Sequence, residues 1–152
     1  MDHPLPILYR DEHLLVADKP AGLLSVGDPR LGRGVAEALA AQGIAARPVH
    51  RLDREVSGAL LCACRDEARA ALEDLFREQR IAKTYWALVR GRPPSAEGEL
   101  VFPILEEGEH ARVSARGRPA RTRYRTLREL PEATELEIEL LTGRKNQIRV
   151  HF

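Results

Sequence analysis

The chain has 152 residues, of which 43% are hydrophobic and 31% are charged, and its formal net charge is +1. This length and composition are typical of one globular domain with its own core, and they exclude a disordered chain. The longest strictly apolar run, Ala59–Cys64, is too short to cross a bilayer, and the first residues do not form a signal peptide pattern. We therefore expect a cytoplasmic protein with no membrane partner.

The two cysteines, Cys62 and Cys64, lie two positions apart in the same apolar run. Residues two apart on a strand point the same way but are too distant for an easy disulfide. There is no second pair that would complete a zinc site, and the histidines have no metal-ligand spacing. We expect reduced core thiols and no metal.

The first quarter of the chain predicts short strands, a turn and a helix. Ile7–Tyr9 and Leu14–Ala17 have strand character on either side of a polar turn. Lys19–Gly22 contains the Pro and Gly of a second turn. Val35–Leu39 suits a short helix that ends at Gly43.

The middle of the chain predicts a buried strand, a helix and another strand. Ala59–Cys64 is continuously apolar, which favours a buried strand. Asp66 has the chemistry of a helix N-cap, and Thr84–Val89 is rich in strand-forming residues. The helix between them would have one apolar face, which consists of Ala68, Ala71, Leu72, Leu75 and Phe76.

The last third predicts further strands. Leu100–Ile104 is a weak candidate, Gly117–Pro119 is a turn, and Thr122–Leu127 is a strand. Glu135–Leu140 alternates strictly between acidic and apolar residues, which is typical of a strand covered on one face in an antiparallel sheet. A final element starts at Gly143. The sequence thus predicts a single mixed α+β domain over residues 1–152, built on a mostly antiparallel sheet with flanking helices.

Charge is strongly segregated within this near-neutral chain. Residues 112–128 contain seven arginines and no acid, and residues 129–143 contain five glutamates and no base. A local basic field can attract RNA even when the whole chain is neutral. The alternative is that Arg123 and Arg125 pair with Glu135, Glu137 and Glu139 on the next strand. The sequence leaves both interpretations open.

The segment from His50 to Gly58 is a charged loop that runs directly into the most apolar strand. Asp53 lies between Arg51 and Arg54, so a cationic neighbour could keep it ionised and oriented. Binding and catalytic groups concentrate on such loops. The alternative is a surface ion-pair cluster that contributes only about 0–1 kcal/mol.

Four segments together resemble RluA-type pseudouridine synthases, which isomerise uridine in ribosomal or transfer RNA. His50-Arg51-Leu52-Asp53 with Ser57-Gly58 is similar to the catalytic-loop signature of that family. The other three matches follow the family in order and approximate spacing, and they are residues 14–23, 82–89 and 142–151. The resemblance implies the pseudouridine synthase fold, an RNA substrate and no cofactor.

The resemblance also implies roles for individual residues. Asp53 corresponds to the obligatory catalytic aspartate, and Tyr85 to the residue that stacks on the target base and is implicated in proton removal at C5. Arg149 corresponds to the basic partner of the aspartate, with Arg144 as the alternative. An arginine keeps a carboxylate charged and oriented, and stacking stabilises a base by about 1–3 kcal/mol. Trp86 points away from Tyr85, and we expect it to pack in the core.

We expect the RNA itself to contact basic side chains on the loops and the arginine-rich segment. His50 supports the loop or contacts phosphate. The other predicted substrate-binding residues are Arg51, Arg54, Arg116, Arg118, Arg121, Arg144 and Lys145. The uridine must leave its stack to reach the carboxylate, so base flipping is expected.

The chain departs from the family pattern in three places. Val56 stands where Thr is common, and Asn146 stands where His is common. Relatives continue past Phe152 for about another third of a catalytic domain, so the domain is expected to be incomplete at its C-terminus. We also expect no N-terminal RNA-binding module. These features keep two alternatives open: an inactive RNA-binding remnant, and a protein-interaction fragment. The target uridine, the oligomeric state and the choice between attack and proton abstraction by Asp53 also stay open.

Overall fold

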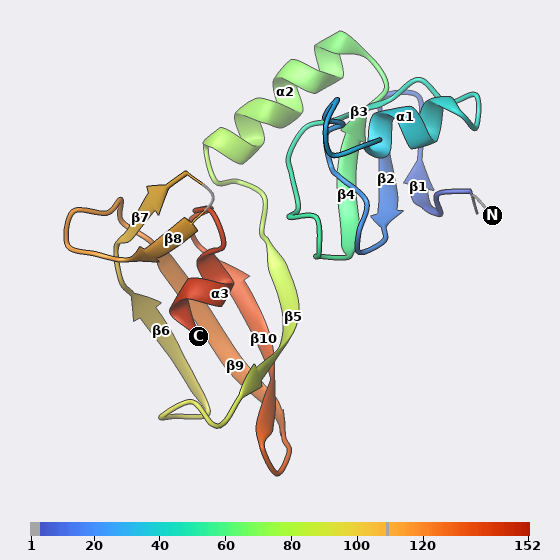
Figure 1. Ribbon diagram of the computed structural model, residues 1–152. Helices are drawn as coiled ribbons and strands as arrows, with labels where there is room; N and C mark the ends of the chain where they lie inside the picture. Colours follow the sequence, from blue (N-terminus) through green and yellow to red (C-terminus); the bar gives the residue numbers. More distant parts are fainter. Residues whose placement is uncertain (1–3, 109) are drawn as a thin grey trace. The chain divides into compact units, whose positions relative to one another are not determined.

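The computed structural model describes residues 4–108 and 110–152. The chain forms two compact units, one up to Arg80 and one from Ile81 to Phe152 (Figure 1). We call them the N-terminal unit and the C-terminal unit. No helix among the described residues is long and apolar enough to cross a membrane.

The N-terminal unit contains one antiparallel sheet in the order β1-β2-β4-β3, with two helices. Its core is made of apolar side chains from β2, β4 and the short helix α1. Leu15, Val35, Leu39 and Leu60 are fully buried there. The elements are β1 (Ile7–Arg10), β2 (Leu14–Lys19), α1 (Val35–Ala40), β3 (Arg47–Pro48), β4 (Gly58–Ala63) and α2 (Asp66–Arg77).

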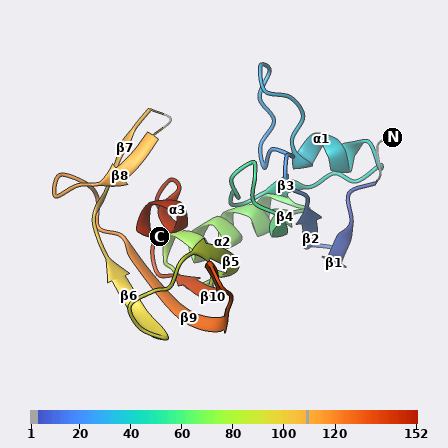
Figure 2. The same ribbon diagram turned by 60° about the horizontal axis from the view of Figure 1, so that its bottom comes forward.

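The C-terminal unit contains an antiparallel sheet in the order β5-β10-β9-β6, a separate β7-β8 hairpin and a short helix. In both views α3 lies over one face of this sheet (Figures 1 and 2). The elements are β5 (Thr84–Arg90), β6 (Glu97–Val101), β7 (Ile104–Glu107), β8 (His110–Val113), β9 (Arg121–Glu129), β10 (Ala133–Leu140) and α3 (Gln147–His151).

These elements confirm the predicted α+β class and its mostly antiparallel pairing. Two local predictions were wrong. The expected strand Leu100–Ile104 is interrupted between β6 and β7 at Phe102-Pro103, because Pro103 has no N–H for a ladder. Asp66 is the first helical residue rather than the N-cap, which is the extended Arg65. Asp66 still lies where a helix dipole favours an acid.

The prediction for Trp86 was also wrong, because its side chain is 61% exposed. Tyr85 faces the other side of β5 and packs against the core of Tyr124, Leu136 and Ile138. The alternation of the strand places Trp86 on the opposite, solvent-facing side. That side carries the charged residues of β10 and β9, so it holds no apolar layer to cover an indole.

The charged face confirms the ion-pair interpretation for two arginines. Arg123 contacts Glu139 at 2.8 Å and Glu99 at 3.7 Å, and Arg125 contacts Glu137 at 2.9 Å. Cross-strand register places each arginine opposite its β10 glutamate. All of these side chains are substantially exposed, so each pair adds little to stability. Their consequence is electrostatic, since the glutamates neutralise the positive charge of β9.

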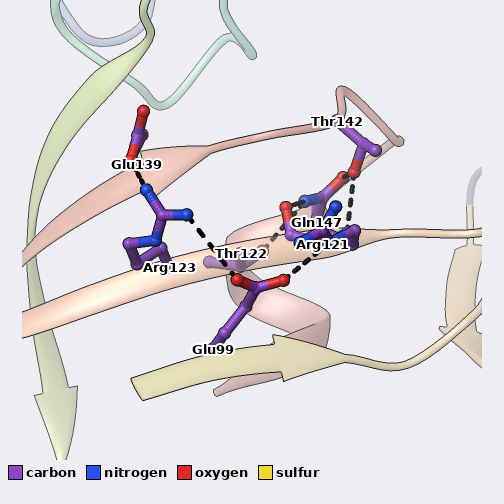
Figure 3. Close-up of polar contacts among 7 residues, drawn as sticks. All are labelled: Glu99, Arg121, Thr122, Arg123, Glu139, Thr142 and Gln147. Carbon is purple, nitrogen blue, oxygen red and sulfur yellow. Dashed lines mark hydrogen bonds and ion pairs between the residues drawn. The ribbon is translucent and has the colours of Figure 1, made fainter. Parts of the chain in front are cut away.

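A buried amide joins α3 to the sheet (Figure 3). The Gln147 side chain is 2% exposed and makes four hydrogen bonds. Its Oε1 accepts from Thr142 Oγ1 at 2.8 Å and from the Arg144 amide at 3.0 Å. Its Nε2 donates to the Arg121 carbonyl at 2.9 Å and to Thr122 Oγ1 at 2.8 Å. The full capacity of an amide side chain is therefore used.

We predict that Gln147→Leu lowers the free energy of unfolding of the C-terminal unit by about 3 kcal/mol, because it leaves buried partners without a hydrogen bond. Urea unfolding followed by fluorescence measures this, since Trp86 is the single tryptophan and lies in this unit. Gln42→Leu is the control, as Gln42 donates one hydrogen bond of 3.3 Å to the Ala38 carbonyl. Equal midpoints for the two variants would contradict the role of the Gln147 amide.

The two cysteines are free, as expected, but they differ in burial. Burial raises the pKa of the Cys62 thiol to about 12, with a smaller contribution from Cys64. At pH 8 Cys62 is therefore protonated, and only its thiolate would react. We predict that iodoacetamide at pH 8 labels the half-buried Cys64 well before Cys62, and that both label alike in denaturant. Equal native labelling rates, measured by peptide mass spectrometry, would contradict the buried position of Cys62.

Candidate functional site

The loop that carries Asp53 connects β3 to β4 in the N-terminal unit. His50 and Asp53 are half-buried, whereas Arg51 and Arg54 are exposed. The Nε2 atom of His50 accepts a hydrogen bond of 3.0 Å from the Leu61 amide, so this nitrogen carries no proton. The His50 ring also lies 4.4 Å from the ring of Phe76 in α2, measured between centroids. These contacts give His50 a supporting position on the loop.

The turn after β2 holds the same loop from the other side. Lys19 is fully buried, and its ammonium donates to the carbonyls of Pro20 at 3.1 Å, Leu23 at 2.7 Å and Arg54 at 3.1 Å. All three N–H groups of the ammonium are thus used. The Gly22 amide adds a hydrogen bond of 2.8 Å to the Arg54 carbonyl, and Arg54 Nε donates to the Gly22 carbonyl at 3.1 Å.

Electrostatics link this lysine to the predicted catalyst. Burial lowers the pKa of Lys19, while the negative charges of Glu55 and then Asp53 oppose that change. Lys19 lies in the 14–23 segment that resembles the family, but the sequence predicted no role for it. The signal that could have found it is a lysine at the end of an apolar strand, because a buried ammonium needs several acceptors.

Asp53 is not part of a surface ion-pair cluster in the described chain, as neither Arg51 nor Arg54 forms a salt bridge with it there. Its carbonyl accepts from the Val56 amide at 3.0 Å, which closes a turn. Asp53 is a half-buried residue on a braced loop, and it has no arginine partner among the residues described for its own unit.

The C-terminal unit carries the other two predicted catalytic residues. Tyr85 is half-buried on β5, as described above, and Arg149 is exposed on α3. Arg149 lines a hollow of about 510 Å³ between α3 and the β8 strand. The other lining residues are His110, Ala111, Arg112, Val113, Asn146 and Val150. The structure therefore places Asp53 in one unit and Tyr85 and Arg149 in the other.

The other basic residues of the 142–151 segment are engaged by main-chain groups. Arg144 Nε donates to the Pro119 carbonyl at 2.9 Å, and Lys145 Nζ donates to the Gly108 carbonyl at 2.8 Å. Burial, together with the charge of Arg144, lowers the pKa of the nearby Lys83. Among the basic residues of this segment, Arg149 lines the hollow. The choice between Arg149 and Arg144 as the partner of Asp53 stays a prediction.

The arginine-rich segment contains two kinds of arginine. Arg121 contacts Glu99 at 2.6 Å, and this pairing raises the pKa of Arg121 and lowers that of Glu99. Arg112 is held by Glu107 at 3.1 Å. By contrast, Arg116 and Arg118 are exposed on the turn after β8, and no carboxylate within residues 4–108 or 110–152 pairs with them.

The turn that bears these two arginines is fixed against β7. The amide and carbonyl of Arg118 each hydrogen bond to Ile104 at 2.9 Å. A Cβ at Gly117 would lie 2.4 Å from the carbonyl carbon of Ile104, so only glycine permits this approach. The turn therefore presents Arg116 and Arg118 from a defined position.

The RNA pseudouridylate synthase family model matches residues 13–152. The chain is 40% identical over 150 residues to ribosomal large subunit pseudouridine synthase C from Vibrio vulnificus strain CMCP6. It is 42% identical over 153 residues to the protein of the same name from Escherichia coli strain K12. Each match covers 95% of this chain and 48% of the relative, so the chain spans about half the length of these curated relatives.

Solved structures show the same similarity in three dimensions. Human RNA pseudouridylate synthase domain containing 1 aligns with a TM-score of 0.84 at 25% identity, over 99% of this chain and 65% of that chain. Human RNA pseudouridylate synthase domain containing 4 aligns with a TM-score of 0.81 at 26% identity, over 96% and 62%. The chain has a braced aspartate loop. Because the family model matches nearly the whole sequence, this chain belongs to the RNA pseudouridylate synthase family.

Proposed function

We propose that this chain is the catalytic part of an RNA pseudouridine synthase that converts uridine to pseudouridine, with both units forming one catalytic domain over residues 1–152. The observation that carries the proposal is the Asp53 loop, in which the half-buried residue Asp53 lies on main chain that is hydrogen bonded to Lys19, Gly22 and Val56. Family membership supplies the reaction class.

The reaction breaks the bond from C1′ of ribose to N1 of uracil and forms a bond from C1′ to C5. The proton of C5 is released and N1 gains one, so no electrons are exchanged with another molecule, and the isomerisation itself calls for no cofactor or metal. Asp53 acts as a nucleophile at the sugar or as a base at the 2′ position. Tyr85 stacks on the detached base and receives the C5 proton, and Arg149 keeps Asp53 ionised and oriented.

The proposed substrate is structured RNA, with ribosomal RNA of the large subunit first and transfer RNA second. The names of the two curated relatives support this order. Arg116 and Arg118 are the best-placed phosphate contacts, because they are exposed and carry no carboxylate partner among the described residues. Arg121 is a weaker contact because Glu99 neutralises it. His50, Arg51, Arg54, Arg144 and Lys145 complete the proposed RNA surface, in a cytoplasmic setting that suits the free thiols.

Asp53→Ala is predicted to abolish tritium release from RNA that contains C5-tritiated uridine, while RNA binding is retained. The physical reason is that no other group in the proposed mechanism acts as the nucleophile at the sugar or as the base at the 2′ position. Glu55→Gln is the matched control, since Glu55 is an exposed acid on the same loop. Undiminished release from Asp53→Ala would remove Asp53 from the mechanism.

The second candidate function is RNA binding without turnover, which the exposed Arg116 and Arg118 favour because no carboxylate among the described residues pairs with them. Under it, the wild-type chain binds RNA in a salt-sensitive manner but releases no tritium from ribosomal or transfer RNA. Release by the wild-type chain excludes this alternative.

RNA binding is predicted to depend on Arg116 and Arg118 more than on Arg123 and Arg125. The double variant Arg116→Gln/Arg118→Gln loses about two phosphate contacts, so the slope of log K against log salt falls by about 2. Arg123→Gln/Arg125→Gln changes the net charge equally but removes arginines already paired with glutamates. Titrations over a range of salt concentrations measure both slopes. The same slope for the two variants would assign the effect to net charge alone.

A further inference from the structure

Ser25 makes a two-point contact with the residue that precedes Asp53. Its Oγ donates to the Leu52 carbonyl at 2.7 Å and accepts from the Leu52 amide at 2.9 Å. Ser25 is 4% exposed and Leu52 is 7% exposed. One hydroxyl therefore satisfies both main-chain groups of a buried residue 27 positions away.

The contact bears directly on the geometry of Asp53. The Leu52 carbonyl belongs to the peptide plane that enters Asp53, and the Asp53 carbonyl belongs to the plane that leaves it. Ser25 holds the first plane, and the Val56 amide holds the second at 3.0 Å. Because the two dihedral angles of a residue are set by its two flanking planes, the direction of the Asp53 Cα–Cβ bond is fixed.

The chemistry of the site calls for a hydroxyl. A serine hydroxyl donates one hydrogen bond and accepts others at the same time, which alanine cannot do. Without it, the buried Leu52 amide and carbonyl would lose their partner, and the loop would reach hydrogen-bonding groups only by shifting.

We propose that Ser25 is a positioning residue for Asp53, which sets the direction of the carboxylate through the Leu52 main chain. This inference rests on the proposed function for its catalytic consequence. Because the proposal includes no contact between Ser25 and RNA, we expect Ser25 to affect the turnover rate and not RNA binding. A misplaced catalytic group slows a reaction by about 10–100-fold even when the substrate binds normally.

The first measurement needs no activity. Amide hydrogen exchange of Leu52, followed by NMR on the full chain, is expected to be at least about tenfold faster in Ser25→Ala than in wild type. Ser25→Thr keeps the hydroxyl and is expected to restore protection. Ser57→Ala removes an exposed hydroxyl from the same loop and is expected to leave Leu52 exchange unchanged. Unchanged Leu52 exchange in Ser25→Ala would overturn the inference.

The second measurement separates positioning from simple loss of stability. For tritium release, Ser25→Ala is expected to lower kcat about 10–100-fold with KM changed less than about twofold, and Ser25→Thr to recover most of kcat. A kcat of Ser25→Ala equal to that of wild type would overturn the catalytic role. So would a kcat of Ser25→Ala that reaches the wild-type value at temperatures below the melting transition of the variant. No release from the wild-type chain would overturn the proposed function and this role together, while Leu52 exchange would still decide the contact itself.

Discussion

The position of Asp53 depends on main-chain groups that are hydrogen bonded to the turn after β2. Lys19 and Gly22 hold the Arg54 carbonyl, and Ser25 holds both main-chain groups of Leu52. A charged loop on the surface would otherwise sample many conformations, because exposed loops lose little by moving. Burial of the Lys19 ammonium is unfavourable by itself, and three carbonyl acceptors offset it. These hydrogen bonds brace the loop that bears Asp53.

In the C-terminal unit, too, a buried polar side chain holds a segment by hydrogen bonds. The Gln147 amide joins the start of α3, the 142–144 turn and β9 through four hydrogen bonds. Arg149 follows two positions later on the same short helix, so the orientation of α3 determines where its guanidinium points. In each unit a buried polar side chain helps to position the segment that bears a predicted catalytic residue. In α3, Ile148 also packs against the core of the sheet.

The sequence predicted the elements that depend on local pattern and missed those that depend on distant partners. Strand alternation was sufficient to place β10, and apolar continuity was sufficient for β4. The short strands β3 and β8 have no such pattern and were not foreseen. The prediction for Trp86 was wrong because the alternation of side chains along β5 defines two faces of the strand but does not show which face is buried. Ser25 and Gln147 have partners 27 and up to 26 residues away, so no local signal reveals them.

In the proposed mechanism the Asp53 carboxylate pairs with the Arg149 guanidinium when RNA is bound, and side-chain NMR can test this proposal without catalysis. The Nε–H resonance of Arg149, assigned in the full chain with RNA bound, is the most direct probe of that pairing. We expect this resonance to shift and to lose protection from exchange in Asp53→Asn, and to stay unchanged in the control Glu55→Gln. An Arg149 resonance that is unchanged in Asp53→Asn would contradict the proposed pairing of Asp53 with Arg149.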